Sequence, residues 1–196
     1  MATTRRGASR VQTELVRRAQ AGDRDAFDAL ATAGYDRMYA IARRILRDGA
    51  AAEDAVQEAL IRIWRDLRSL RDIDRYDAWS NRLLIRSCHD QSRRSRRMKA
   101  EVGEIDLNHR DTRDEYASVG HRDELERAFS RLTIEQRAVV VLTHYQGMSA
   151  AEVGEALGIP LGTVYSRLHY ALRAMRSAID DQSGHELAGR NVESAQ

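Results

Sequence analysis

Only one proline, Pro160, interrupts the 196 residues of this chain. Proline breaks helices because it lacks a backbone N–H and its ring clashes with the preceding turn. Good helix formers such as Ala, Leu, Arg and Glu are abundant, and runs that alternate β-branched or aromatic with polar residues are absent. The sequence therefore predicts an all-α fold, and its length fits one or two compact domains.

The composition excludes several classes of protein. The formal net charge is only +2, so the overall balance of charge indicates no class of partner. The single cysteine, Cys88, excludes an internal disulfide and a cysteine zinc site. We expect a small buried residue there and favour this over a redox-sensing role. The histidines are scattered, and no HExxH, phosphate-binding glycine loop or GxSxG motif occurs, so we expect no catalytic site, no metal and no cofactor.

No apolar run approaches the length that crosses a bilayer. The N-terminus, "MATTRRGASR", is basic but lacks the apolar segment of a signal peptide. We therefore expect a cytoplasmic protein.

Apolar residues recur at three- and four-residue spacings in a first block, residues 11–97. A short amphipathic start precedes a helix that Asp23 is expected to cap and that "RDGA" is expected to break at Gly49. A third helix is predicted at about Ala51–Leu67 and a fourth at about Ala78–Arg97. The stretch between these two helices, 68–77, is predicted to be a loop.

Residues 98–120 have few apolar side chains and several acidic ones, which predicts a flexible acidic linker. A second helical block, 121–181, follows, and the polar tail, 182–196, is expected to be disordered. In the second block, Thr133 and Glu135 lie near the start of a helix that ends at Gly147. Ser149 is expected to cap a short helix that stops at Gly158.

The short helix, its glycine-containing turn and a longer helix behind Pro160 form a helix-turn-helix pattern. Val164, Leu168 and Leu172 are predicted to form the buried stripe of the second helix. The polar and aromatic side chains on its other faces are candidates to contact base edges and phosphates. These residues are Thr163, Tyr165, Ser166, Arg167, His169, Tyr170 and Arg173. Because αα-hairpins share this pattern, a bundle helix with a solvated polar face stays open from this stretch alone.

Three motifs in order resemble the extracytoplasmic-function (ECF) sigma factors, a group of the bacterial primary-type sigma factor family. "AEDAVQEALIRIWRDL" resembles region 2.2, and "YDAWSNRLLIRSCHDQSRRSRR" resembles regions 2.3 to 2.4. "LTIEQRAVVVLTHYQGMSAAEVGEALGIPLGTVYSRLHYALRAMR" resembles region 4. The resemblance covers roughly residues 11–181.

The resemblance implies two small helical domains joined by a linker. Region 2, residues 11–97, would bind core RNA polymerase and open and read the minus-ten element. Region 4, residues 121–181, would read the minus-thirty-five element as duplex DNA. The implied partners are promoter DNA, both duplex and single-stranded, the β′ clamp helices and β flap of the polymerase, and an anti-sigma factor. We expect the β-flap face on residues 135–147, and no enzymatic activity in the chain itself.

The predicted third helix carries the polymerase-binding candidates. Val56, Leu60, Ile63 and Leu67 make its apolar stripe, and a second, mainly polar face lies off that stripe. By resemblance this second face grips the β′ clamp helices. Its members are Asp54, Gln57, Glu58, Ile61, Arg65 and, at the border, Trp64. Without the resemblance it would read as an ordinary exposed polar face.

The fourth helix carries a stripe of arginines, an electrostatic footprint for phosphates. By resemblance, the loop before it forms a pocket for a flipped-out base, and aromatic side chains stack on unpaired bases. The minus-ten candidates are Leu70, Tyr76, Trp79, Arg82, Arg86, Arg93, Arg94 and Arg97. Trp79 could instead anchor the helix in the core, and we expect this of Trp79 more than of Tyr76. Arg86 stands where many family members carry the Asn that reads the flipped base.

Two other functions remain as alternatives. A two-domain helix-turn-helix regulator could bind duplex DNA without polymerase, and an all-α scaffold could bind only protein. The helix "EDAVQEALIRIW" separates the first alternative from a sigma factor, because a simple repressor does not need it.

Overall fold

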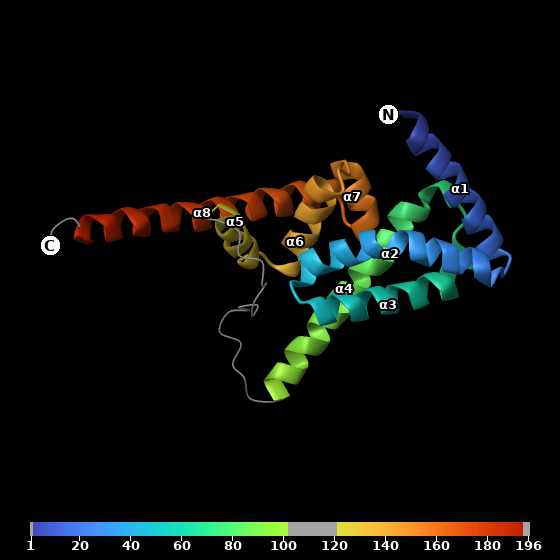
Figure 1. Cartoon of the computed structure of the whole chain (residues 1–196), viewed down its shortest axis with the longest axis horizontal. Coiled ribbons are helices and arrows are strands. Elements are labelled where there is room, and N and C mark those ends of the chain that lie inside the picture. Colours follow the sequence, from blue (N-terminus) through green and yellow to red (C-terminus); the bar gives the residue numbers. More distant parts are fainter. Residues whose placement is uncertain (1, 102–120, 194–196) are drawn as a thin grey trace.

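The computed structural model describes the backbone of residues 2–101 and 121–193 and the side chains of residues 11–98 and 125–179. Within these ranges all regular elements are helices, which confirms the predicted all-α fold (Figure 1). The first block contains α1 (Ala2–Gln20), α2 (Arg24–Leu46), α3 (Gly49–Asp66) and α4 (Tyr76–Glu101). The second contains α5 (His121–Ser130), α6 (Ile134–Val140), the π-helical turn η3 (Val141–Tyr145), α7 (Ala150–Leu157) and α8 (Leu161–Glu193).

Side-chain caps start the helices at the predicted places. The Asp23 carboxylate accepts a hydrogen bond from the Ala26 N–H, so Asp23 caps α2 as expected. Thr133 and Ser149 both form capping boxes, with Gln136 and Glu152 as their respective partners. Each box satisfies backbone N–H groups that the first turn of a helix leaves without partners.

The break between α2 and α3 lies earlier than predicted. Arg47 ends α2 in the left-handed conformation, at φ 62°, and donates its N–H to the Arg43 carbonyl. Asp48 then caps α3 by accepting from the Ala51 N–H, so Gly49 is the first residue of α3 and not the break itself. Because Arg47 adopts the left-handed conformation and Asp48 caps α3, the break between the two helices does not depend on Gly49.

Three other predicted boundaries also shift. The expected loop at 68–77 contains the 3-10 turns η1 (Leu67–Ser69) and η2 (Ile73–Arg75), and α4 begins at Tyr76. α4 continues to Glu101, so the first four residues of the expected linker are helical, while 102–120 lie outside the described residues. α8 continues to Glu193, so most of the expected disordered tail is also helical; 194–196 lie outside the described residues.

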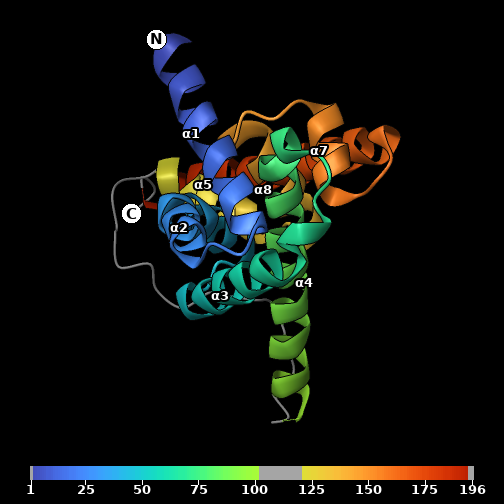
Figure 2. The ribbon, with the colours of Figure 1, turned by 90° about the vertical axis from the view of Figure 1, so that its right-hand side faces the viewer.

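One apolar core joins the two blocks. It runs from Val16 in α1 through Ile41, Ile45 and Leu84 to Val164 in α8. α3 packs between α2 and α4, while α4 also contacts α7, and α2 contacts α6. Figure 2 shows the first part of α4 beside α7, and its C-terminal end projecting beyond the other helices. The arrangement therefore brings the arginine-bearing helix against the helix-turn-helix.

Candidate polymerase and DNA interfaces

The predicted polymerase-binding residues form one accessible face of α3. Asp54, Gln57, Ile61 and Arg65 are exposed, and Glu58 is partly exposed. Ile61 is 62% exposed at the centre of this polar face, although isoleucine is among the residue types most often buried. A single apolar side chain ringed by polar ones is the arrangement found at helix-on-helix docking surfaces.

Trp64 lies at the border of this face, as predicted. Its ring packs on Phe27 of α2, with ring centroids 4.8 Å apart, while 38% of the residue remains exposed. The aromatic contact fixes the rotamer of Trp64 without covering its outer edge. Trp64 can therefore be anchored in the fold and still meet a partner.

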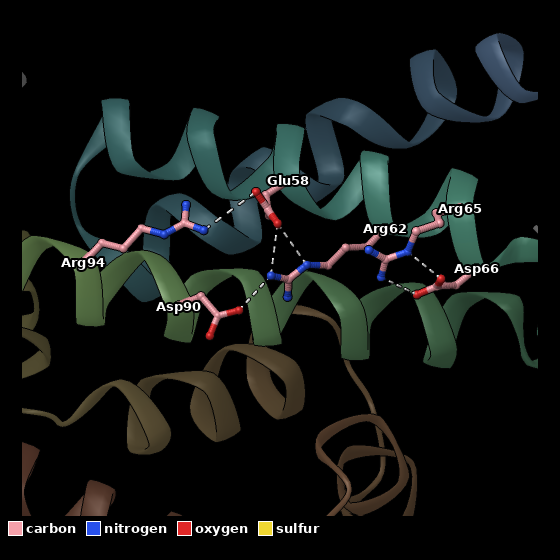
Figure 3. Close-up of polar contacts among 6 residues, drawn as sticks. All are labelled: Glu58, Arg62, Arg65, Asp66, Asp90 and Arg94. Atoms are coloured by element: carbon pink, nitrogen blue, oxygen red, sulfur yellow. Dashed lines mark hydrogen bonds and ion pairs between the residues drawn. The ribbon is translucent and has the colours of Figure 1, made fainter.

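An ion network fixes the polar side of α3 against α4 (Figure 3). The Arg62 guanidinium donates to Glu58 Oε1 at 3.1 and 3.2 Å and to Asp90 Oδ2 at 2.8 Å. Burial alone would lower the pKa of Arg62, but the hydrogen bonds to Asp90 and Glu58 raise it above its ordinary value. Arg94 approaches the other oxygen of Glu58 at 4.0 Å. The predicted contact Glu58 is thus held in place by an arginine that the sequence argument did not single out.

The sequence does carry a signal for Arg62. It lies four residues after Glu58, the spacing at which helical side chains pair. Gln91 plays a similar part, because its side-chain amide donates to Asp54 Oδ2 at 2.8 Å. Both residues hold carboxylates of the candidate polymerase face in place.

The arginines of α4 divide between two sides of the helix. Arg82, Arg86 and Arg93 line a cleft that faces α6, α7 and α8. Arg94 instead lies toward α3, where it approaches Glu58 (Figure 3). Arg82, Arg86, Arg93, Arg94 and Arg97 are all exposed, as a phosphate-binding role requires. Phosphates can therefore approach α4 from two sides, and its arginines do not form a single stripe.

The burial of the two aromatic candidates, Tyr76 and Trp79, is the reverse of what was expected. Tyr76 is only 9% exposed and belongs to the core, and burial raises the pKa of its hydroxyl to about 12. Trp79 is only partly buried, with its ring centroid 6.3 Å from that of Tyr76. The expectation that Trp79 is the more buried ring was wrong, because η2 turns Tyr76 inward at the start of α4. Leu70, which follows η1, is half-buried at the edge of the same core.

The helix-turn-helix forms as predicted, with α7 and α8 as its two helices. Gly158 ends α7 in the left-handed conformation, at φ 66°, and the Pro160 carbonyl accepts from the Thr163 and Val164 N–H groups at the start of α8. Gly154 of α7 is a further residue on which this motif depends, and no sequence pattern indicated it. A Cβ there would lie 3.1 Å from the Ile159 carbonyl oxygen and 3.6 Å from Val164 Cγ2. The two helices approach so closely because position 154 has no side chain.

Most of the predicted DNA-facing side chains of α8 are accessible. Tyr165 and Tyr170 are 58% and 59% exposed, and the rings of His169 and Tyr170 meet edge to face at 5.6 Å. Thr163 and Arg167 are only partly exposed. The remaining members, Ser166 and Arg173, are exposed.

The buried stripe of α8 differs from the predicted one. Leu172 is 43% exposed, while Ala171 is fully buried in its place. Each four-residue step turns a helix by about 40° beyond a full circle, so two steps from Val164 rotate Leu172 out of the core. A seven-residue step falls only about 20° short of two turns, which returns Ala171 to the face of Val164.

Much of the segment expected to meet the β flap is inside the protein. Residues 137–142 are buried, whereas His144 and Tyr145 are exposed. Arg44 of α2 lies over the Tyr145 ring, 3.7 Å from its centroid. Any flap surface on this segment is therefore confined largely to its ends.

Two family descriptions match the chain in the order of its two blocks. Sigma-70 region 2 matches residues 30–98, and Sigma-70 region 4 matches residues 122–175. The ECF RNA polymerase sigma factor SigL of Mycobacterium tuberculosis is 37% identical over 161 residues, which cover 78% of this chain and 90% of SigL. The chain is a member of the ECF sigma factor family. It is thus a DNA-binding transcription initiation factor, and this result favours the sigma-factor prediction over a regulator that acts without polymerase.

Further ECF sigma factors and solved structures agree with this assignment. SigM of M. tuberculosis is 35% identical, with 81% of this chain and 79% of SigM covered. CnrH in complex with the cytosolic domain of CnrY has a TM-score of 0.61 at 23% identity, covering 87% of this chain and 98% of that one. RpoE of Bartonella quintana in complex with the anti-sigma factor NepR also has a TM-score of 0.61, at 22% identity, covering 79% of this chain and 96% of that one. At these identities the two structures show a shared fold.

In residues 2–101 and 121–193, no helix is long and apolar enough to cross a membrane. The same residues hold no group of three or more His, Cys, Asp or Glu side chains placed to bind a metal ion. Cys88 is fully buried, and burial raises the pKa of its thiol to about 12, so it lacks the accessible thiolate of a reactive cysteine.

Proposed function

We propose that this ECF sigma factor binds core RNA polymerase through the exposed face of α3 and directs it to promoters. In this proposal Asp54, Gln57, Glu58, Ile61, Trp64 and Arg65 contact the β′ clamp helices. The observation that supports it most is the 62% exposure of Ile61 on a polar face. Arg62 and Gln91 hold this face rigid, because they bind its carboxylates Glu58 and Asp54 respectively. A rigid, preorganised face loses less conformational entropy when a partner docks.

The DNA roles follow the division into regions 2 and 4. The exposed arginines of α4 hold phosphates of the opened minus-ten element, and Trp79, the more accessible of the two aromatic candidates, stacks on an unpaired base. Tyr76 can stack only if η2 moves, because its ring lies in the core. The start of α8 enters the major groove of the minus-thirty-five element, where Arg167 and Arg173 contact phosphates or bases.

Two further parts of the proposal concern location and partners. We expect the protein to act in the cytoplasm, where the polymerase carries out all the chemistry. An anti-sigma factor is the expected inhibitor, supported by the shared fold with the B. quintana RpoE that was solved with NepR.

The polymerase face can be tested with a double substitution, Gln57→Ala with Ile61→Ala. Core polymerase affinity should fall by one to two orders of magnitude, since truncating a central interface residue typically costs about 1–3 kcal/mol. Asp36→Ala, on the exposed surface of α2, is the matched control and should leave core affinity unchanged. Circular dichroism must show the same helix content in all variants. An unchanged core affinity in the double variant would refute the assignment of this face.

A further inference from the structure

A basic cleft lies beside α4 and has the size of a small-molecule site. Its volume is about 430 Å³, and such sites typically occupy about 300–1,000 Å³. Arg82, Arg86 and Arg93 line it from α4, and α8 contributes Arg167. A helix makes about three turns in eleven residues, so the three arginines of α4 share one face and extend over about 16 Å. The cleft therefore presents positive charge along a line, with a further cation from another helix.

The four guanidinium groups of this cleft have no partner within the described part of the chain. None of them forms a hydrogen bond or an ion pair with another described residue. Arg94, on the other side of α4, differs in this respect, because it approaches Glu58 at 4.0 Å. Arg82 lies close against the turn before α8, where a Cβ on Gly158 would come within 2.6 Å of its Nη2. Like charges gathered in one cleft repel one another, and a multivalent anion bound among them removes that repulsion.

The two carboxylates that line the cleft leave most of its positive charge unbalanced. Asp90 already accepts a hydrogen bond from Arg62 at 2.8 Å, on the side of α3. Glu135 Oε1 lies 3.7 Å from Nδ1 of His89. Burial, opposed by Glu135, lowers the pKa of His89, so its ring adds no charge at pH 7. Among the described residues, four arginines thus share one carboxylate that no arginine pairs with, a balance that suits an anion with several negative charges.

The rest of the lining indicates the chemical class of this anion. It consists of small and aliphatic residues, namely Ile85, Ala138, Ala156, Leu157 and Gly158. No Phe, Tyr or Trp is among the described lining residues, so a nucleobase finds none of these rings to stack on. The planar fork of arginine matches phosphate oxygens and binds them through two parallel hydrogen bonds. A line of such forks fits a chain of linked phosphates, which carries negative charge along its whole length.

We propose that this cleft is a binding site for a short polyphosphate chain, either inorganic or the phosphate tail of a nucleotide. Arg82, Arg86 and Arg93 bind the phosphates from α4, and Arg167 binds them from α8. The inference does not rest on the DNA roles proposed above, because neither polymerase nor promoter DNA takes part in this binding.

Isothermal titration calorimetry of the full chain tests the site, with inorganic tripolyphosphate as the probe and with no DNA or polymerase present. At constant ionic strength we expect saturable binding of one tripolyphosphate per chain, and a Tm that rises with its concentration. Arg86→Gln with Arg93→Gln should weaken binding at least about 10-fold, because it removes charge-assisted hydrogen bonds. Arg167→Gln alone should weaken it by a similar factor, since the site draws on both helices.

Matched control variants remove the same charge outside the cleft. Arg94→Gln with Arg96→Gln does so on α4, and Arg176→Gln does so on α8; all three residues are exposed. These controls should weaken binding far less than the cleft variants do. Circular dichroism should show the same helix content in every variant, because the substituted side chains are all at least partly exposed.

Two further probes identify the source of the phosphates. Adenosine triphosphate that binds as tightly as tripolyphosphate supports recognition of the phosphate chain alone. A tighter nucleotide supports a nucleotide tail as the ligand, and a weaker one supports an inorganic chain. Orthophosphate that binds as tightly as tripolyphosphate would overturn the assignment to a chain.

The variants decide whether the cleft itself is the site. Binding that does not saturate, or that weakens equally in the cleft and control variants, would show only a diffuse attraction to basic surface and would overturn the proposal. Loss of binding in the α4 double variant with none in Arg167→Gln would also overturn it, because the anion would then lie on α4 alone.

Discussion

The ion network between α3 and α4 makes a measurable contribution to stability through Arg62. Its guanidinium forms three charge-assisted hydrogen bonds of 2.8–3.2 Å while its side chain is only 16% exposed. Such bonds contribute about 1.5–3 kcal/mol each where they are buried. Glu58 and Asp90 are 35% and 37% exposed, so solvent screening reduces the total considerably. We expect Arg62→Ala to lower the free energy of unfolding by about 1–2 kcal/mol, and the Tm by about 3–6 °C for a chain of this size.

Urea denaturation of the full chain, followed by circular dichroism, measures this loss. Arg65→Ala is the matched control, because Arg65 is 68% exposed and pairs with Asp66, its neighbour on the same helix (Figure 3). A double-mutant cycle of Arg62→Ala with Asp90→Ala isolates the coupling between the two helices. Equal midpoints for the Arg62 and Arg65 variants, or a coupling energy of zero, would refute the reasoning.

Four further predictions concern the two blocks. Gly154→Val should destabilise the helix-turn-helix and weaken binding to minus-thirty-five duplex, since even a Cβ lies 3.1 Å from the Ile159 carbonyl oxygen. Gly162→Ala, whose Cβ meets nothing within 4 Å, should leave thermal melting and duplex binding almost unchanged. Burial, opposed by Glu135, lowers the pKa of His89, so the unfolded chain binds more protons as pH falls below about 6.5. Stability should therefore fall below that pH in urea titrations, and His89→Gln should flatten the dependence. Cys88 should react with a thiol reagent slowly in native protein and rapidly in urea, and fast native labelling would contradict its burial. If the six arginines of α4, which are the five minus-ten candidates and Arg96, neutralise about six phosphates, DNA affinity should fall with salt at a log-log slope near about −5, and a slope near zero would remove them from the interface.

Local sequence signals predicted those helix ends that a single capping residue determines. Asp23, Thr133 and Ser149 cap helices because each supplies a side-chain oxygen to the first turn, whatever lies beyond it. Gly158 ends α7 for an equally local reason, the left-handed conformation that glycine adopts without strain. Each of these interactions spans at most a few residues, so the neighbouring sequence is enough to predict it.

Features that depend on distant residues could not be predicted in the same way. Tyr76 is buried because it packs into a core made by other helices, and Leu172 is 43% exposed because its side of α8 turns away from the core that buries Val164 and Ala171. The contact of α4 with α7 joins segments that are separated by nearly 50 residues along the chain, and no spacing in either segment indicates it. The spacing of Glu58 and Arg62 within α3 indicates that they pair, but the contact of Arg62 with Asp90 of α4 becomes evident only in the fold.

Transcription in vitro tests the central claim most directly. Core RNA polymerase is combined with the purified chain and a library of bacterial promoter fragments, and the start sites of the transcripts are mapped. The account predicts transcripts that begin at defined positions, share sequence elements near minus ten and minus thirty-five, and vanish when the chain is left out or carries Gln57→Ala with Ile61→Ala. Transcripts that are identical with and without the chain, or no transcription from any fragment, would contradict its role as a sigma factor.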